Sequence, residues 1–326
     1  MSKEPNTKQH YIPECYLKNF SPNLKFVYIY DKKVSKSFPN SLNSIANHDF
    51  FYDIPEKYYS KELKPKYGSK HFEKAFFAEH VEKLYNQSLE NIINKSNTYI
   101  EKPKHTEVLT NEEKEILAQL IAIQHLRLPK IKDDASITMK KVLHESIKII
   151  KSAFENSNPE SNELSNKIDF EDDYDSVLHA QLYANEELVA EFASKILNKH
   201  WVFLVSKTSN FYTSDNPIII KNHLENQKPY CDGFGMKGVE VIFPIGKSVL
   251  LTLWDKEYFP DKLKFDNTFN STKSKEVLAY NALQYYWATR QVYSYSNEFK
   301  IIELLKKENN GKEIIFKHPI TLVNGK

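Results

Sequence analysis

The spacing of hydrophobic and polar positions changes near the middle of this chain. Between about residues 71 and 198, apolar residues recur every three to four positions, which is typical of amphipathic helices. Residues 199–326 instead carry short runs of aromatic and β-branched residues, which indicate strands, and two similar runs within residues 25–38 predict a hairpin. The sequence therefore predicts a single α+β unit over residues 1–326, with a helical N-terminal half packed on a mainly antiparallel sheet formed largely by the C-terminal half.

The boundaries of one predicted helix are well marked. Thr110 is followed three positions later by Glu113, which is the spacing of a capping box, and Pro129 marks the end. The polar stretch 155–175 predicts an exposed connection between the helical and the strand-rich lobes. Further helices are predicted at residues 71–93, 135–154, 178–196 and 273–288. Further strands are predicted at residues 201–206, 211–213, 218–220, 239–244, 249–254, 291–294 and 299–305.

Arginine is rare in this sequence, since Arg127 and Arg290 are the two arginines among 45 Lys and Arg side chains. A planar guanidinium recognises anions in a way that a lysine ammonium does not, so both positions are candidate anion-binding sites. Projection onto a helix places Gln124 and Arg127 in the apolar stripe of residues 110–129. A buried guanidinium needs a carboxylate, carbonyls or a ligand anion as its partner. Arg290 follows the 273–288 helix, where a helix-end cation is the simpler interpretation.

Polar residues also interrupt the apolar sides of two other predicted helices. Glu73 projects onto the border of an apolar side, so it is a candidate partner for Arg127 or a candidate metal ligand. Glu79 and Glu82 project together onto another face, which is typical of solvated residues. Asn281 lies in a helix that is apolar all round and therefore needs buried hydrogen-bond partners.

Two further segments carry candidate chemistry. Residues 214–217 join two strand-like runs, and an Asx-type turn is the simpler interpretation because every residue there favours turns. The alternative is that Asp215 presents its carboxylate to a site and is positioned by Ser214 and Asn216. Near the start of the chain, His10 is more simply a packed histidine, but histidine titrates near neutral pH and stays a candidate base.

Most established catalytic motifs are absent or incomplete. Residues 233–238 match GxGxxG, but a strand-like run follows them instead of a helix, so we expect a mobile loop that could cover a site. The sequence contains no HExxH, GxSxG or GxxxxGK[ST], and the SDN triplet at 214–216 lacks its SxxK and KTG companions. The zincin, α/β-hydrolase, P-loop and penicillin-recognising classes therefore lack their signatures.

Composition only weakly constrains the cellular location and the binding partners of the protein. A net charge of +2 predicts no general coat of nucleic acid, although a local basic groove is compatible with the many lysines. The apolar runs are too short to span a bilayer, and the first nine residues lack the apolar core of a signal peptide. The two cysteines form no CxxC pair. We expect a cytoplasmic protein without a membrane partner.

The opening HYIPxxYLKNF, residues 10–20, and the TSDNP block, residues 213–217, carry a family resemblance. From His10 to about Tyr293 the chain resembles the bacterial family catalogued as domain of unknown function 4238. The other matching positions are Phe51, Tyr52, Glu73, Glu79, Gln124 to Arg127, Trp201, Phe243, Pro244, Asn281 and Arg290. The resemblance implies a domain and no reaction, and the general character of the family suggests a role in bacterial conflict such as phage defence.

The first functional hypothesis is a metal-dependent hydrolase of phosphodiesters, a nuclease-like enzyme that acts on nucleic acid. Its expected catalytic residues are His10, Glu73 and Asp215. Its expected metal ligands for Mg²⁺ or Mn²⁺ are Glu73, Glu79 and Asp215, since carboxylates suit both ions. Its expected substrate-binding residues are Gln124, Arg127, Ser214, Asn216, Asn281 and Arg290.

Two alternatives stay open. One is a non-catalytic effector module that binds an anion or nucleotide, with Arg127 as the clamp and residues 233–238 closing over the ligand. The other is that the polar residues have no ligand and form a buried network that specifies the fold. That network would contain Glu73, Gln124, Arg127, Asp215 and Asn281.

Overall fold

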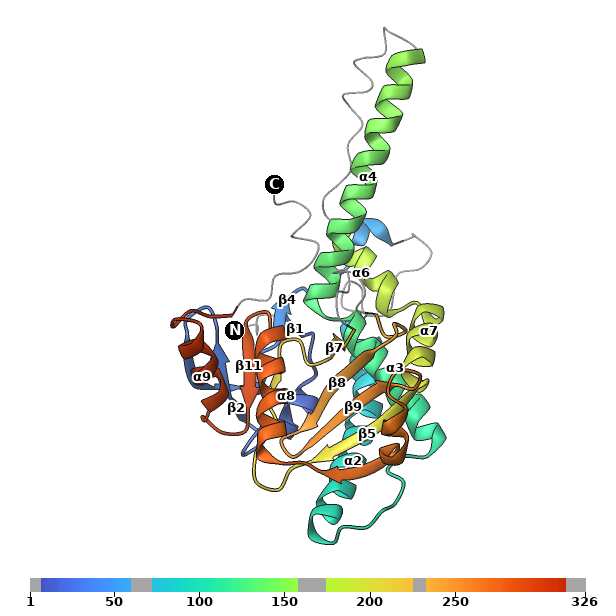
Figure 1. Ribbon diagram of the computed structural model, residues 1–326. Helices are drawn as coiled ribbons and strands as arrows, with labels where there is room; N and C mark the ends of the chain where they lie inside the picture. Colours follow the sequence, from blue (N-terminus) through green and yellow to red (C-terminus); the bar gives the residue numbers. More distant parts are fainter. Residues whose placement is uncertain (1–6, 60–71, 158–173, 225–232, 315–326) are drawn as a thin grey trace.

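The computed structural model describes residues 7–59, 72–157, 174–224 and 233–314 of the chain. Helices dominate the first half and strands the second (Figure 1). Among the described strands, the pairs are antiparallel apart from a parallel pair between β5 (Lys199–Val205) and β10 (Thr268–Ser271). The predicted α+β class, with a mainly antiparallel sheet in the second half, is confirmed.

The predicted capping box starts the helix α3 (Asn111–Leu126). The Thr110 hydroxyl accepts the backbone N–H of Glu113, and the Glu113 carboxylate accepts the backbone N–H of Thr110. No helix within the described ranges is long and apolar enough to cross a membrane. The other α-helices are α1 (Glu14–Leu17), α2 (Glu82–Glu101), α4 (Pro129–Ser157), α6 (Asp175–Tyr183), α7 (Glu186–Leu197), α8 (Ser274–Trp287) and α9 (Lys300–Glu308).

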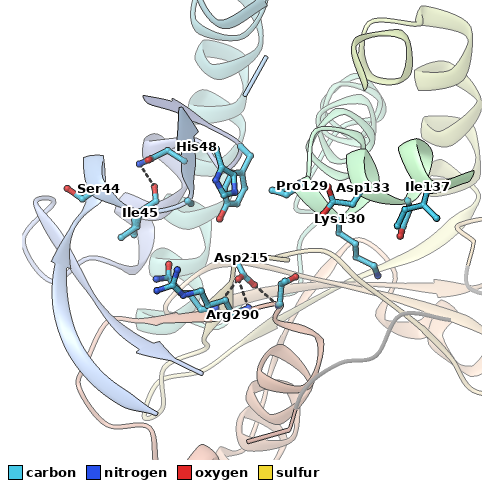
Figure 2. Close-up of a pocket in the computed structure, with 15 residues that line it drawn as sticks. Ser44, Ile45, His48, Pro129, Lys130, Asp133, Ile137, Asp215 and Arg290 are labelled. Atoms are coloured by element: carbon cyan, nitrogen blue, oxygen red, sulfur yellow. Dashed lines mark hydrogen bonds between the residues drawn. The ribbon is translucent and has the colours of Figure 1, made fainter. Parts of the chain in front are cut away.

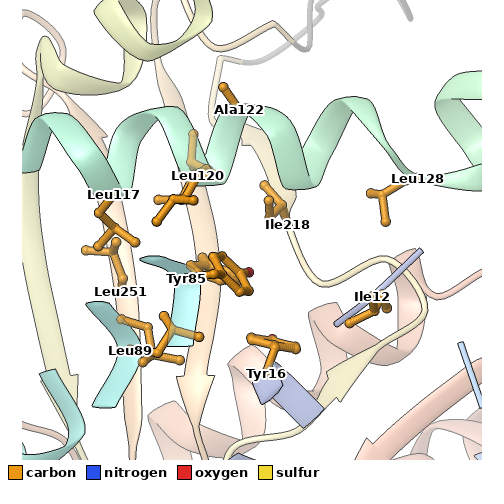
Figure 3. Packing of buried hydrophobic residues seen from close by; sticks show 14 of the residues in the cluster. Ile12, Tyr16, Tyr85, Leu89, Leu117, Leu120, Ala122, Leu128, Ile218 and Leu251 are labelled. Atoms are coloured by element: carbon orange, nitrogen blue, oxygen red, sulfur yellow. The ribbon is translucent and has the colours of Figure 1, made fainter. Parts of the chain in front are cut away.

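A five-stranded sheet with the order β10-β5-β9-β8-β7 forms the centre of the fold. Its remaining strands are β7 (Ile219–Asn222), β8 (Val239–Gly246) and β9 (Val249–Asp255). One face packs on α2 and α3, where Tyr85, Leu89, Leu117 and Leu251 meet in one buried cluster (Figure 3). This cluster draws residues from both the helix-rich and the strand-rich parts of the chain, so burial of apolar surface joins the two parts.

A four-stranded sheet brings the two ends of the described chain together. Its order is β3-β2-β11-β6, and the predicted hairpin within residues 25–38 is its β2–β3 pair. Strand β11 pairs with β2 on one side and β6 on the other, so β11 lies between the TSDNP block and the N-terminal hairpin. The strands are β2 (Phe26–Asp31), β3 (Lys36–Ser41), β6 (Thr213–Ser214) and β11 (Gln291–Ser294). A separate pair joins β1 (Lys8–His10) to β4 (Asn47–Asp49).

Two predicted elements differ from the structure, and a third is largely untested. Residues 299–305 were expected to form a strand, but Phe299 precedes α9 and residues 300–305 belong to it; its Ile302 is buried in a small cluster with Phe299. The predicted 178–196 helix is divided into α6 and α7, because the side chain of Asn185 accepts the backbone N–H of Leu188 and starts a new helix. The expected connection at 155–175 lies largely outside the described residues.

Candidate functional site

A cavity of about 450 Å³ opens where three segments of the chain meet (Figure 2). The first segment runs from Tyr11 to β4 and includes His48. The second is the start of α4, and the third is the turn between α8 and β11, together with Asp215. The lining residues are Tyr11, Ser44, Ile45, Ala46, Asn47, His48, Pro129, Lys130, Asp133, Asp134, Ile137, Asp215, Thr289, Arg290 and Gln291.

Asp215 fixes the turn that forms one side of the cavity. Its carboxylate accepts the backbone N–H groups of Thr289, Arg290 and Gln291 at 2.7–2.8 Å. Burial raises the pKa of the Asp215 carboxyl, and the three N–H donors oppose this rise because they stabilise the ionised form. Both oxygens are therefore engaged by the backbone (Figure 2). The Asp215 side chain holds Arg290 in place at the cavity.

Arg290 lines this cavity through a half-exposed side chain. Its Nε and Nη2 atoms each lie 2.8 Å from the Oδ2 atom of Asp31, whose side chain is 1% exposed. Burial acts to raise the pKa of Asp31, but hydrogen bonds from Arg290 and Gln291 outweigh it and hold the pKa below its usual range. A carboxylate that stays ionised holds the guanidinium at a fixed orientation while 52% of the Arg290 side chain remains exposed.

Arg127 is buried instead, with 1% of its surface exposed. Its Nε donates to the Tyr52 hydroxyl at 2.8 Å, and its Nη2 donates to the carbonyl oxygen of His10. The same Nη2 lies 3.5 Å from a Glu82 carboxylate oxygen, and the guanidinium carbon lies 3.9 Å from the centre of the Phe77 ring. Burial acts to lower the pKa of Arg127, whereas Tyr52 and Glu82 raise it, so the side chain stays charged.

Neighbouring polar residues extend this buried arrangement. Gln124, one helical turn before Arg127, donates to the carbonyl oxygen of Tyr11 at 3.0 Å. The Tyr52 hydroxyl also donates to the His10 carbonyl at 3.2 Å. The His10 imidazole does not line the 450 Å³ cavity, and burial lowers its pKa. These contacts hold the backbone at the start of the HYIP motif against α3.

Glu82 has the role beside Arg127 that was expected of Glu73, while Glu73 lies nearby in a desolvated position. Residues Phe72–Val81 form a π-helix, η5, which continues into α2. Projection with an α-helical period fails there, because a π-helical turn contains more residues. Glu82, expected to be solvated, is the ion-pair partner of Arg127, and burial raises the pKa of the nearby Glu73 to about 7.

The expected metal ligands do not come together. Within the described ranges, no group of three or more His, Cys, Asp or Glu side chains could hold a metal ion, and Glu73, Glu79 and Asp215 all belong to those ranges. Asp215 directly follows β6, and its carboxylate oxygens accept backbone N–H groups from the turn that leads into β11. The donor set expected for Mg²⁺ or Mn²⁺ therefore does not fit a shared ion.

The other expected binding residues are buried beneath the cavity. Asn281 accepts the backbone N–H of Tyr212 at 2.7 Å and donates to the carbonyl oxygen of Asn210 at 2.9 Å. Ser214 donates to the carbonyl oxygen of Asn216, whose side chain donates to the carbonyl oxygen of Trp287. These hydrogen bonds fasten residues 210–217 to α8. They satisfy the expectation that Asn281 needs buried partners.

A protein-family model described as "Protein of unknown function (DUF4238)" matches residues 8–298 of the chain. The chain belongs to the DUF4238 family. No curated protein and no solved structure matches it. In this member of the family, the opening HYIP motif and the TSDNP block both line one cavity, through Tyr11 and Asp215.

Four titratable residues of the cavity gave no signal in the sequence: His48, Lys130, Asp133 and Asp134. The first two turns of α4 carry three of them, while His48 lies on β4. Charged residues near a helix start are common, so only the fold reveals that they face a cavity. Burial raises the pKa of Asp134 to about 6, because its nearby Lys130 offsets the loss of hydration only in part.

The expected loop over the site takes another place. Phe234 is buried, with its ring centre 5.0 Å from that of His125 on α3 and 5.6 Å from that of Phe192 on α7. Residues 233–238 contribute no lining to the 450 Å³ cavity. The described part of this loop is therefore anchored to the helices and does not cover the cavity.

The two arginines should respond differently to substitution by lysine. Arg127→Lys loses the planar fork that bonds Tyr52 and His10 together, so the free energy of unfolding should fall by about 2–4 kcal/mol. Arg290→Lys alters a half-exposed pair and should cost less than about 1 kcal/mol. Urea unfolding of wild type and both variants measures the two losses of free energy. Equal losses would show that the buried contacts of Arg127 do not support the fold.

Glu73 should make stability depend on pH. Its folded-state pKa of about 7 exceeds the usual value of 4.5, so the folded protein keeps a proton that the unfolded chain releases. The tighter binding of this proton adds to the free energy of unfolding. That stabilisation is fully present below pH 4.5 and is lost as the pH rises through 7. The glutamine of Glu73→Gln does not ionise, so the free energy of unfolding of this variant relative to wild type should rise by on the order of 2 kcal/mol from pH 5 to pH 8. A difference that stays constant across that range would exclude a raised pKa.

Proposed function

We propose that this protein binds a nucleotide or a closely similar phosphorylated molecule in the 450 Å³ cavity. The observation that carries this proposal is the position of Arg290, a permanently charged guanidinium that is held by a buried carboxylate and still half exposed at the cavity. Arginine binds phosphate through geometrically specific hydrogen bonds. A site of this volume is within the usual range of about 300–1,000 Å³ for small-molecule pockets.

The phosphate end of the ligand is assigned to Arg290 and Lys130. Both side chains line the cavity, one from the turn after α8 and the other from the first turn of α4. The Lys130 ammonium lies 5.5 Å from the centre of the Trp287 ring. Two cations on neighbouring walls favour an anion that lies between them.

The base end is assigned to the opposite part of the cavity. The exposed ring of His48 stacks on Tyr11, with ring centres 5.3 Å apart and planes inclined by 25°. A ring that is supported on one side and exposed on the other provides a surface for a planar base. Asp133 supplies a hydrogen-bonding group from the start of α4 (Figure 2), and Asp134 also lines the cavity. This combination of groups favours a nucleotide over a simple inorganic anion.

Hydrolysis of a phosphodiester is a second proposal, and one observation favours it. A carboxyl group with a pKa of about 6, such as Asp134, can transfer a proton near neutral pH. The earlier set of Glu73, Glu79 and Asp215 is not carried into this proposal, because those side chains do not converge. Turnover would then depend on Asp134, whereas binding alone would depend on Arg290.

Ligand binding can be tested by thermal shift and calorimetry with AMP, ADP and inorganic phosphate. We expect AMP and ADP to raise the melting temperature more than phosphate does. Arg290→Ala and His48→Ala should each weaken AMP binding at least about tenfold, which corresponds to about 1.4 kcal/mol. Lys256→Ala, an exposed lysine outside the cavity, is the matched control and should bind as wild type does.

Two outcomes would contradict the proposal: no shift with any nucleotide, or unchanged binding in both cavity variants. His48→Ala decides the matter if Arg290→Ala is unstable, since that substitution leaves the buried Asp31 without its partner. Hydrolysis is followed separately with bis(p-nitrophenyl) phosphate, with and without added Mn²⁺. Turnover that Asp134→Asn abolishes supports the second proposal, and its absence leaves binding as the function.

A further inference from the structure

A second cavity, of about 540 Å³, lies on the face of the five-stranded sheet that is turned away from the main core. The alternation of side chains along a strand explains its position. Along β5, Trp201 and Phe203 point into the main core, whereas Val202 and Leu204 line this cavity. Along β9, Leu253 is in the core and Trp254 lines the cavity.

Helix α8 covers only part of this outer face (Figure 1). Its Val277 packs with Ile219, Ile242 and Leu250 in a small buried cluster. Beyond that cluster the first turns of α8 form one wall of the cavity, and the short 3₁₀-helix η8 (Pro260–Phe265) contributes to another. The residues that line this cavity share no member with those of the 450 Å³ cavity.

The floor of the cavity holds a buried carboxylate, Glu240 on β8, whose side chain is 3% exposed. One carboxylate oxygen lies 2.7 Å from the Nε2 atom of His223, and the other accepts the Tyr280 hydroxyl at 3.0 Å. Burial raises the pKa of Tyr280, so the phenol keeps its proton and donates it in this bond. Glu240 is therefore satisfied by two side chains that both line the cavity.

This contact occupies the Nε2 atom of His223 and leaves the Nδ1 atom. When the imidazole is neutral and donates from Nε2 to Glu240, its Nδ1 atom is unprotonated and accepts hydrogen bonds. The ring is also held by aromatic neighbours, with centres 5.6 Å from Trp254 and 5.3 Å from Phe259. In that form, His223 is an oriented acceptor among the residues that line the cavity.

Cationic and aromatic groups also line the cavity, as does Glu276, whose carboxylate accepts the Thr272 hydroxyl and the Lys273 backbone N–H. Lys221 on β7 and Lys262 on η8 bring two ammonium groups to the cavity, and the Lys262 ammonium lies 4.6 Å from the centre of the Trp254 ring. Tyr99 and Phe265 add apolar surface. Two cations, an oriented acceptor and aromatic walls match a molecule that carries an anionic group, hydroxyl groups and an apolar ring face.

We propose that this second cavity binds a small hydroxylated anion with the chemistry of a sugar phosphate. A ligand hydroxyl donates to the Nδ1 atom of His223, and the phosphate pairs with Lys221 and Lys262. Glu240 and Tyr280 act as positioning residues, because they fix the imidazole and its tautomer. The site is independent of the proposed nucleotide cavity, so each can fail without the other.

Calorimetry with ribose 5-phosphate tests the proposal, with ribose and inorganic phosphate as partial ligands. We expect ribose 5-phosphate to bind at least about tenfold more tightly than either, since only it engages both His223 and the lysines. His223→Asn should weaken this binding at least about tenfold. His144→Asn, an exposed histidine on α4, is the matched control.

The absence of detectable ribose 5-phosphate binding would overturn the proposal, and so would equal binding by wild type and His223→Asn. If His223→Asn does not fold, Lys221→Met decides, since that lysine is partly exposed. Wild-type affinity in Lys221→Met would then exclude the assigned phosphate position.

Discussion

The fold depends on one buried guanidinium, that of Arg127, which ties together elements that are distant in the sequence. Its hydrogen bonds reach Tyr52 and the backbone of His10, and its ion pair reaches Glu82. Removing such a charge from water is costly, so each partner has to be in place for the folded state to be stable. The Phe77 ring beneath the guanidinium adds a favourable contact. The arrangement therefore requires β1, η5 and α3 to assemble together.

The same interaction sets the geometry of the candidate site. Arg127 caps the end of α3, and α4 begins two residues later at Pro129, which lines the 450 Å³ cavity. On the other side, the backbone held by Arg127 and Gln124 leads directly to Tyr11 in the cavity wall. Two walls are thus fastened to one buried cluster, while Asp215 fixes the third. Arg127 therefore supports the walls of the cavity from within the core, whereas Arg290 is exposed to a ligand.

Local signals predicted a large part of this structure. The capping box at Thr110, the N-terminal hairpin and the buried position of Arg127 follow from spacing and periodicity alone. The π-helix could not be predicted this way, because its winding invalidates an α-helical projection, and Glu82, which was expected to be solvated, pairs with Arg127. The cavity residues of α4 were missed for another reason. Their importance arises from tertiary contacts with β4 and with the turn after α8, and no sequence pattern encodes those contacts.

A double-mutant cycle between Arg127 and Tyr52 tests the structural role of the buried guanidinium most directly. Arg127→Met, Tyr52→Phe and the double variant are compared with wild type by urea unfolding. Direct contact predicts a coupling free energy of about 1–3 kcal/mol, because either single substitution already breaks the shared hydrogen bond. Losses that add within about 0.5 kcal/mol would contradict the account, since they would show that the two side chains stabilise the protein independently.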